Sequence, residues 1–252
     1  MGTPTESSRR VAIRFLATDS FADPRVALGA FELLAPAERE TLARLRAADA
    51  RRDYLATHAL TRTTLTEFAG GDARRLEFHV SSLGRPSVAA PRELRDLRFS
   101  ASHADGMAIC AVGEQVHVGA DVETLRNVGS DALALAELIA SRRERQTVVE
   151  ASIATRSARL LTIWTLKEAL CKATGLGLRF PVRNVTVVDD LGRPLATPLF
   201  DVAPSGDAPR WQLACRYVTR SHLAAVAVRG AAQDRIDFQF EEARVEAVSH
   251  GR

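Results

Sequence analysis

The chain has 252 residues, of which 46% are hydrophobic and 26% are charged, and its formal net charge is +3. This composition excludes a disordered chain, and no apolar run approaches the roughly 18 residues of a membrane-spanning helix. The length allows one large domain or two small ones, and the mild basic excess favours an acidic partner or a phosphorylated ligand.

The hydrophobic pattern predicts a mixture of helices and strands along the chain. In the first half we expect a strand at 11–17, helices at 25–34, 36–45 and 50–68, and strands at 106–112 and 115–122. In the second half we expect helices at 131–150 and 157–173, strands at 184–188, 211–217 and 222–228, and then a polar tail. This mixture predicts an α+β fold.

Four short segments recur in the same order in the two halves of the chain. Residues 32–35, 59–62, 83–86 and 106–112 resemble residues 137–140, 169–172, 191–194 and 222–228, respectively. Ordered matches at a near-constant offset predict two similar α+β halves, at 1–115 and 116–230, with an extension at 231–252. A ligand would then bind in the cleft between the halves. The alternative is a chance likeness between short apolar segments.

The cysteines and the first residues bear on the cellular compartment. Cys110, Cys171 and Cys215 lie far apart and lack the spacing of metal ligands, so we expect buried, reduced thiols. Residues 1–10 are polar and show no secretory signal. A reducing, cytoplasmic location is therefore expected.

The first chemical motif spans residues 118–123, Val-Gly-Ala-Asp-Val-Glu. The flanking valines are typical of a strand, and positions i and i+2 of a strand point to the same face. Asp121 and Glu123 should therefore project together beyond the apolar stretch. Adjacent carboxylates repel unless a cation lies between them, and oxygen ligands suit Mg²⁺. The alternative is a solvated strand end.

The second motif spans residues 164–172, Trp-Thr-Leu-Lys-Glu-Ala-Leu-Cys-Lys. Its apolar residues recur at helical spacing and should face the core. Thr165, Glu168 and Lys172 fall on the other side of the helix. Glu168 and Lys172, four residues apart, could form only a weak surface ion pair. Lys167 could be purely structural.

Two further motifs could contact a phosphate group. Residues 99–103, Phe-Ser-Ala-Ser-His, place Ser102 and His103 before an expected strand, and residues 84–86, Gly-Arg-Pro, place Arg85 in a turn. A single histidine could equally be a structural residue, and Arg85 could simply be exposed. The Gly-x-Ser-x-Gly motif of many serine hydrolases is absent.

Taken in order, the four motifs resemble the motif series of the 4'-phosphopantetheinyl transferases of the pseudo-dimeric Sfp type. The resemblance covers residues 36–228, and its most specific part is Trp-Thr-Leu-Lys-Glu-Ala-x-x-Lys-x-x-Gly at 164–175. It implies two similar α+β halves related by a pseudo-two-fold axis. It also implies an enzyme that transfers the 4'-phosphopantetheine group of coenzyme A to a serine of an apo acyl or peptidyl carrier protein, with 3',5'-ADP as the second product.

The resemblance further implies a role for each site residue. Asp121, Glu123 and Glu168 would bind the cofactor, Mg²⁺, together with oxygens of the coenzyme A diphosphate and water. Asp121, Glu168 and Lys172 would be catalytic, with Lys172 neutralising the diphosphate. Either Glu168 or a metal-bound water would accept the serine proton. The residues that contact coenzyme A, the substrate, would be Lys172, Arg51, Arg85, Ser102 and His103.

The sequence departs from the family pattern near the expected nucleotide site. Arg85 stands where the family usually has lysine, and Glu38 and Thr41 stand where some relatives have lysines. Recognition of the 3'-phosphate of coenzyme A would then pass to other basic residues, namely Arg39, Arg44, Arg46 or Arg51.

Two other interpretations stay open. The chain could be a different Mg²⁺-dependent enzyme of nucleotide-phosphate substrates, or a non-catalytic module that binds a carrier protein or nucleic acid. The intact set of acids with Lys172 argues against an inactive protein, and no basic patch interleaved with aromatic residues supports nucleic acid. The expected partners are coenzyme A and an apo carrier protein, without nucleic acid or membrane, and we expect a monomer.

Overall fold

The computed structural model describes residues 7–128, 132–201 and 210–250. The chain divides into two compact units. The N unit comprises residues 10–115 and 237–252, and the C unit comprises residues 116–236 with residues 1–9. The change of unit after Gln115 falls where the two halves were expected to meet, whereas residues 231–252 form no separate extension but divide between the units.

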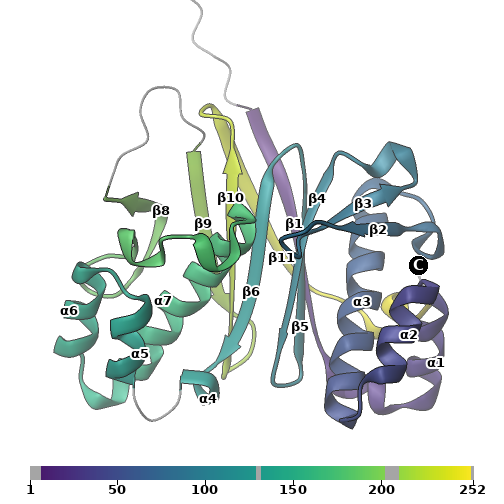
Figure 1. The fold of residues 1–252 in the computed structure, drawn as a ribbon, viewed down its shortest axis with the longest axis horizontal. Helices are drawn as coiled ribbons and strands as arrows, with labels where there is room; N and C mark the ends of the chain where they lie inside the picture. Colours follow the sequence, from purple (N-terminus) through teal and green to yellow (C-terminus); the bar gives the residue numbers. More distant parts are fainter. Residues whose placement is uncertain (1–6, 129–131, 202–209, 251–252) are drawn as a thin grey trace, which may run out of the picture. The chain divides into compact units, whose positions relative to one another are not determined.

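In the N unit the longest of three helices packs against an antiparallel sheet, and the two shorter helices pack on the long one (Figure 1). The strands of the sheet lie in the order β11-β1-β5-β4, and Phe15 of β1 faces Ile109 of β5. A second hairpin, β2-β3, follows the long helix α3. The elements are β1 (Ser7–Ala17), α1 (Pro24–Leu33), α2 (Pro36–Arg44), α3 (Ala48–Ala69), β2 (Glu77–Val80), β3 (Pro86–Ala90), β4 (Leu97–Ala104), β5 (Met107–Glu114), β11 (Asp234–Glu242) and α8 (Val245–His250).

The C unit repeats this arrangement. Its sheet has the order β6-β10-β9, and Asp121 of β6 faces Ala225 of β10. The elements are β6 (His117–Thr124), α4 (Leu125–Val128), α5 (Ala132–Ile139), α6 (Arg142–Glu150), α7 (Ile153–Thr174), β7 (Val185–Val188), β8 (Pro194–Phe200), β9 (Arg210–Tyr217) and β10 (His222–Gly230). The α+β fold expected from the sequence is confirmed.

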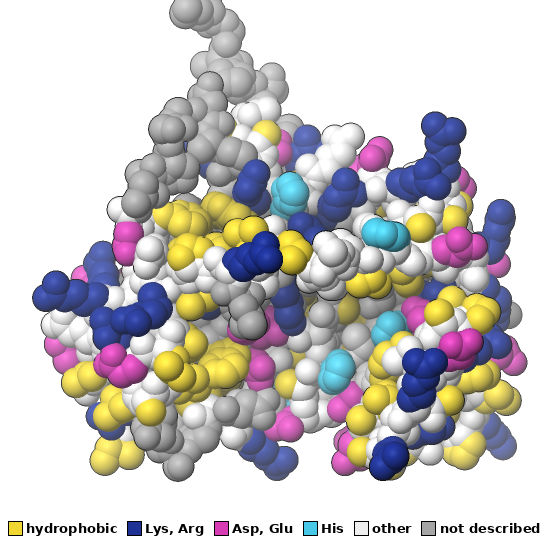
Figure 2. Space-filling model, in the orientation of Figure 1, with side chains coloured by type: hydrophobic (Ala, Val, Ile, Leu, Met, Phe, Trp, Pro, Cys, Tyr) yellow, Lys and Arg dark blue, Asp and Glu magenta, His cyan; other side chains and the backbone are white. Residues whose placement is uncertain are grey.

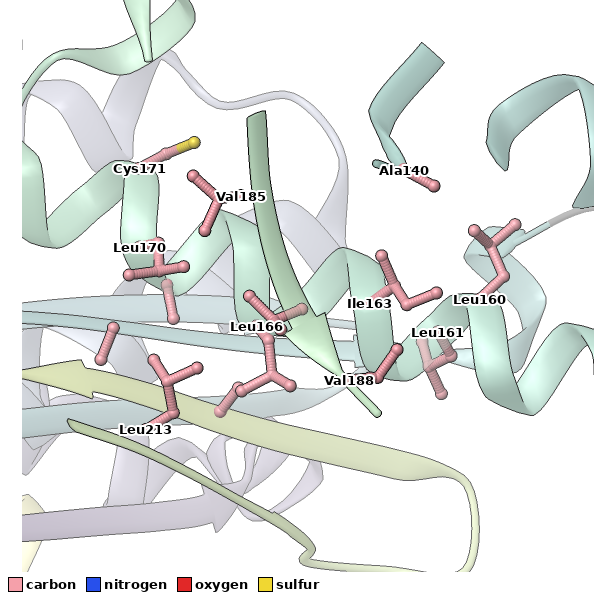
Figure 3. Packing of buried hydrophobic residues seen from close by; sticks show 14 of the residues in the cluster. Ala140, Leu160, Leu161, Ile163, Leu166, Leu170, Cys171, Val185, Val188 and Leu213 are labelled. Atoms are coloured by element: carbon pink, nitrogen blue, oxygen red, sulfur yellow. The ribbon is translucent and has the colours of Figure 1, made fainter. Parts of the chain in front are cut away.

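The long helix α7 is the centre of the C-unit core. Leu160, Leu166 and Leu170 of α7 are fully buried, and they belong to one hydrophobic cluster with Val185 and Val188 of β7. Figure 3 shows these side chains together with Leu213 of β9. Burial on nearly all sides fixes the position of α7, and with it the position of any polar side chain that the helix carries.

The two units share details that go beyond the order of their elements. In each unit a strand is followed by shorter helices, a helix of 22 residues, a hairpin and two more strands. The hairpin turns at Gly84 and Gly192 both use a positive φ, 80° and 75°, which glycine adopts without strain. These turns are the recurring Leu-Gly-Arg-Pro segments, so this part of the sequence repeat marks a structural repeat.

Each unit also contains a buried ion pair between its long helix and the helix just before it. These are α3 and α2 in the N unit, and α7 and α6 in the C unit. Glu38 accepts hydrogen bonds from Arg62 Nη2 at 2.6 Å and from the Ala35 amide at 2.7 Å. In the C unit, Glu144 lies 2.6 Å from Lys167 Nζ and accepts a hydrogen bond from the Ser141 amide at 2.7 Å. Because these charges are buried, removing one partner of such a pair costs about 3–5 kcal/mol.

The ion pairs correct one of the sequence matches. Helices α3 and α7 begin at Ala48 and Ile153 and have equal lengths, so Arg62 corresponds to Lys167. The match of residues 59–62 with 169–172 was therefore wrong by five positions. It followed the apolar pattern, which repeats along a buried helix and does not fix the register.

Three other expectations differ from the structure. The helix expected at 131–150 is broken, because Ser141 caps a new helix, α6, in a capping box with Glu144. The tail, for which only a polar character was expected, forms β11, which pairs with β1, and then α8. Ser102 and His103 precede the strand β5, as expected, but they lie within a further strand, β4, that was not expected. Among the described residues, no helix has the length and apolar character to cross a membrane.

Candidate active site

The candidate site forms where α7 packs directly against β6 in the C unit. Gly119 of β6 lies against the helix backbone: a Cβ atom at this position would come within 3.0 Å of Ala173 Cα and closer still to Ala169 O and Ala173 N. No side chain fits in that space. Because Asp121 and Glu123 share the strand face of Gly119, this close approach brings both acids towards α7.

Asp121 is bonded to the helix. Its Oδ1 atom accepts a hydrogen bond from Lys172 Nζ at 2.7 Å, and the residue is only 3% exposed. The alternative of a solvated strand end therefore does not hold for Asp121, since the packing of α7 on β6 covers it. Glu123 is half-buried. A charged pair with little solvent around it is held more firmly than an exposed surface pair.

Glu168 lies one helical turn before Lys172 and is half-buried. Burial raises the pKa of the Glu168 carboxyl, and the negative charge of Asp121 raises this pKa further, while Lys172 opposes the shift. Asp121 and Glu168 are thus close enough to repel one another. The structure brings together Asp121, Glu168 and Lys172, from a strand and a helix that are far apart in the sequence.

This arrangement fits a divalent cation in part. Within the described ranges, no group of three or more His, Cys, Asp or Glu side chains is arranged to hold a metal ion. Mg²⁺, however, is commonly held by only one or two protein carboxylates with substrate phosphates and water. The repelling pair of Asp121 and Glu168 suits that mode, because a cation would relieve the repulsion. Glu123, on the same strand face, stays a prediction as a third ligand.

The other predicted site residues all belong to the N unit. Arg51 is exposed on the first turn of α3, and Arg85 is half-buried in the turn between β2 and β3. Burial, and then the charge of Arg98, lower the pKa of the Arg85 guanidinium. Ser102 and His103 face Ile109 and Ala108 of β5 in a regular ladder, so their side chains point to opposite faces of β4. They would contact different groups of a ligand.

The arginines considered for the 3'-phosphate differ in their surroundings. Arg39 donates hydrogen bonds to the carbonyl oxygens of Leu34 and Glu32, at 2.9 and 3.2 Å, so its guanidinium supports its own helix. Arg44 lies 3.5 Å from Glu40 in an exposed pair. Arg46 and Arg51 are exposed. These last two are the better candidates to bind an incoming phosphate.

The structure also explains why Glu38 departs from the family's lysine pattern. Its carboxylate accepts hydrogen bonds from the Ala35 amide and from Arg62, and it lies 2.8 Å from His58 Nδ1. A lysine there would place a second positive charge beside the fully buried Arg62. Glu38 is therefore a structural residue, and any phosphate contact must come from its neighbours.

Sequence reasoning missed the structural role of two residues near the site. A glycine inside a strand often marks a close backbone approach, and this signal was available for Gly119. Glu144 stands three residues after Ser141, the spacing of a capping box, although its contact with Lys167 Nζ could not be inferred from spacing. The structure confirms a structural role for Lys167, which donates hydrogen bonds to the carbonyl oxygens of Ile139 and Val182 at 2.8 and 2.7 Å.

Comparison with known proteins identifies the C unit. Residues 117–227, from β6 to β10, match the family described as the 4'-phosphopantetheinyl transferase superfamily. The chain is 29% identical over 180 residues to the 4'-phosphopantetheinyl transferase HetI of Nostoc sp., covering 71% of this chain and 72% of that protein. It is 25% identical over 155 residues to the 4'-phosphopantetheinyl transferase Sfp of Bacillus subtilis, covering 61% and 66%.

A solved structure also matches. The holo-[acyl-carrier-protein] synthase of Helicobacter pylori, in complex with coenzyme A, is 17% identical, with a TM-score of 0.33; the match covers 40% of this chain and 96% of that one. The sequence match to the family spans the strands and the helix that carry Asp121, Glu123, Glu168 and Lys172. By the family match over residues 117–227 and by these curated relatives, the chain is similar to the 4'-phosphopantetheinyl transferases.

Proposed function

We propose that this chain transfers the 4'-phosphopantetheine group of coenzyme A to a serine hydroxyl of an apo acyl or peptidyl carrier protein, with Mg²⁺ as cofactor. The observation that carries the proposal is the convergence of Asp121, Glu168 and Lys172 in the segment that matches the family. Two relatives are named 4'-phosphopantetheinyl transferases, and the motif series of this chain supports the same reaction.

The proposed contacts with coenzyme A follow the motif series of the sequence. Lys172 has three N–H donors, so it can keep its bond to Asp121 and still donate to an oxygen of the coenzyme A diphosphate. Charge-assisted hydrogen bonds from Arg51 and Arg85, with polar contacts from Ser102 and His103, would hold the nucleotide end. Arg46 joins this group as an exposed basic residue of the same unit.

The reaction is a phosphoryl-type transfer. The serine oxygen attacks the β-phosphorus of coenzyme A, the bond from that phosphorus to the bridging oxygen of the diphosphate breaks, and 3',5'-ADP leaves with the electron pair. Asp121 and Glu168, with Glu123, would hold Mg²⁺, which supplies charge neutralisation at the diphosphate oxygens. Lys172 stabilises the negative charge that develops on the leaving group.

Glu168 is the residue of this chain that we propose to accept the serine proton. Burial and the neighbouring Asp121 raise the pKa of its carboxyl while no cation is bound, and a bound Mg²⁺ would lower this pKa again, so the proposed role rests on the position of Glu168 beside the proposed metal. Its half-buried position at the open side of α7 leaves it accessible to a substrate hydroxyl. Because the serine hydroxyl of the carrier protein is the nucleophile, the proposed reaction needs no nucleophilic side chain from this chain.

The deciding experiment is intact-mass analysis of a purified apo carrier protein after incubation with the enzyme, coenzyme A and Mg²⁺. The carrier should gain the mass of one phosphopantetheine, and 3',5'-ADP should appear in equal amount. EDTA should stop the reaction, and added Mg²⁺ should restore it. A carrier whose acceptor serine is replaced by alanine serves as the control.

The same experiment separates the alternatives. Carrier binding without a mass gain would indicate a non-catalytic module, and breakdown of coenzyme A without a modified carrier would indicate another Mg²⁺-dependent enzyme. We further propose a cytoplasmic monomer; light scattering of the purified chain at micromolar concentration tests the oligomeric state.

A further inference from the structure

Helix α7 exposes a single line of side chains in its central part. From Leu160 to Ala173 every residue is buried, with the exception of Trp164, Glu168 and Lys172, which are half-buried. Residues four apart lie one above another on the same helix face, about 6 Å apart along the axis. The accessible stripe of α7 therefore consists of an indole, a carboxylate and an ammonium group, and two of these three belong to the candidate active site.

The indole N–H of Trp164 has no acceptor among the residues that the structure describes. Its Nε1 atom is buried and makes no hydrogen bond to them. Buried tryptophan N–H groups usually find a partner, and leaving one unsatisfied is costly. The residue as a whole is only half-buried, so another part of the same side chain is exposed. A ligand that packs on this exposed part and displaces the cover of the N–H group could supply the acceptor that it lacks.

The position of the indole limits the kind of acceptor. Trp164 lies one turn from Glu168, on the side away from Lys172, so it is two turns from the residue proposed to neutralise the diphosphate. Its N–H is a neutral donor, which suits an uncharged carbonyl oxygen rather than a phosphate that charged groups already bind. Amide carbonyls occur in the pantetheine arm of coenzyme A and in the main chain of a carrier protein.

We infer that Trp164 is a substrate-binding residue, whose indole N–H donates a hydrogen bond to an amide carbonyl of the bound substrates. The identity of the substrates rests on the proposed function. The exposed stripe and the unsatisfied N–H do not depend on it.

The first test compares Trp164→Phe with the wild-type enzyme. Phenylalanine keeps an apolar ring and removes the donor, so kcat/KM should fall about two- to tenfold, the worth of one hydrogen bond. The melting temperature should not fall, because an unsatisfied buried donor is removed. A rise in KM for coenzyme A alone assigns the acceptor to the pantetheine arm, and a rise for the carrier alone assigns it to the carrier main chain. Trp211→Phe, in β9, is the matched control.

The second test observes the N–H group itself in the wild-type chain. The protein has two tryptophans, so ¹⁵N labelling gives two indole signals, and Trp211→Phe identifies the signal of Trp164. Coenzyme A with Mg²⁺, or an apo carrier whose serine is replaced by alanine, should shift the Trp164 indole proton downfield and slow its exchange with water.

Two results would overturn the inference. One is an indole signal that neither ligand moves, together with unchanged kinetics of Trp164→Phe. The other is a lowered melting temperature with equal losses for both substrates, which would mean that Trp164 only supports packing. If the wild-type enzyme modifies no carrier, the proposed function fails, and a shift of the indole signal by coenzyme A still shows that Trp164 binds this ligand.

Discussion

Asp121 stabilises the contact between β6 and α7 as well as being a proposed metal ligand. Its carboxylate is buried and bonded to Lys172, so deleting the whole side chain would change packing, charge and chemistry together. A substitution that keeps the shape of the side chain is needed to separate these effects.

We predict that Asp121→Asn lowers kcat by about a hundredfold or more, because an amide cannot supply the negative charge that a cation needs. The amide oxygen can still accept the hydrogen bond from Lys172, so the melting temperature should change little. Activity assays at saturating Mg²⁺ with thermal unfolding test both parts. Asp190→Asn, which alters an exposed pair with Arg143, is the control. Near-wild-type turnover of Asp121→Asn would exclude Asp121 as a ligand.

Part of the candidate site could be predicted from the sequence. Spacing alone placed Asp121 and Glu123 on one strand face, and Glu168 and Lys172 on one helix face. Spacing could not show that Asp121 is buried, because burial depends on how closely α7 approaches β6. The accessible stripe that includes Trp164 also depends on elements packed around α7, which no local pattern describes.

At the level of elements, the contact between β6 and α7 determines whether the site forms. Gly119 allows the two backbones to meet, and the acids that follow it on β6 reach α7 only because of this contact. The close approach at Gly119 therefore determines where the carboxylate of Asp121, two residues further along β6, is placed.

We predict that Gly119→Ala destabilises the protein by about 1–3 kcal/mol, because the added methyl group meets backbone atoms that cannot rotate away. The displaced helix should also lower activity by more than tenfold at temperatures where the protein remains folded. Gly70→Ala is the control, since φ there is 82° but no atom lies within 4 Å of the new methyl group. It should lose stability and keep activity. Full activity of Gly119→Ala would show that the site tolerates a helix shift.

The ion pair between α2 and α3 gives a pH-dependent prediction. Burial raises the pKa of Glu38, but the hydrogen bond from His58, the charges of Arg62 and His58, and the Ala35 amide together lower this pKa below its ordinary value. A lowered pKa in the folded state means that the stabilisation is present above the unfolded value of 4.5 and is lost as the pH falls below it.

We therefore expect Glu38→Gln to lower the free energy of unfolding by about 3 kcal/mol at pH 7, because Arg62 stays buried without its counter-charge. The difference from wild type should shrink as the pH falls through the lowered pKa of Glu38, because the wild-type side chain then loses its charge as well. Denaturant unfolding at several pH values measures this, with the exposed Glu40→Gln as control. A difference that does not change with pH would show that shape and not charge matters.

The helices and strands were predicted correctly where a long apolar pattern marks them. The prediction failed where a single contact determines whether an element begins or forms. The long helix α7 was found within a few residues of its ends. The break before α6 depends on the cap at Ser141, and β11 forms because β1 offers an edge to pair with. Edge pairing is a tertiary event, so the polar tail carried little local signal for a strand.

At the scale of the whole molecule, part of the positive charge is already neutralised by acidic side chains of the same chain, and this part cannot attract an acidic partner. Several arginines of residues 39–52 and 142–156 are engaged with acids, in the pairs Arg44–Glu40, Arg52–Asp49, Arg143–Asp190 and Arg145–Glu137. Figure 2 shows basic and acidic side chains interspersed on the face in view. Steering of an acidic carrier would thus rest mainly on the net charge of +3.

We predict that the KM for the carrier rises by about two- to fivefold between 50 mM and 0.5 M salt, since the Debye length falls to roughly 4 Å and long-range attraction is screened. The kcat at saturating carrier should change little. A titration of apo carrier at both ionic strengths, with coenzyme A saturating and Mg²⁺ fixed, measures the effect. A carrier KM that ignores salt would assign recognition to apolar contacts and leave the transferase function untouched.

The repeated arrangement of the two units implies unequal selection on the two halves of the gene. Each unit keeps a buried ion pair on its long helix, because each must fold. The position in the N unit that corresponds to Glu168 is Thr63 on α3, which carries no carboxylate. Under the proposed function, mutations at Thr63 are judged by packing alone, so the N unit is free to drift there where the C unit is not.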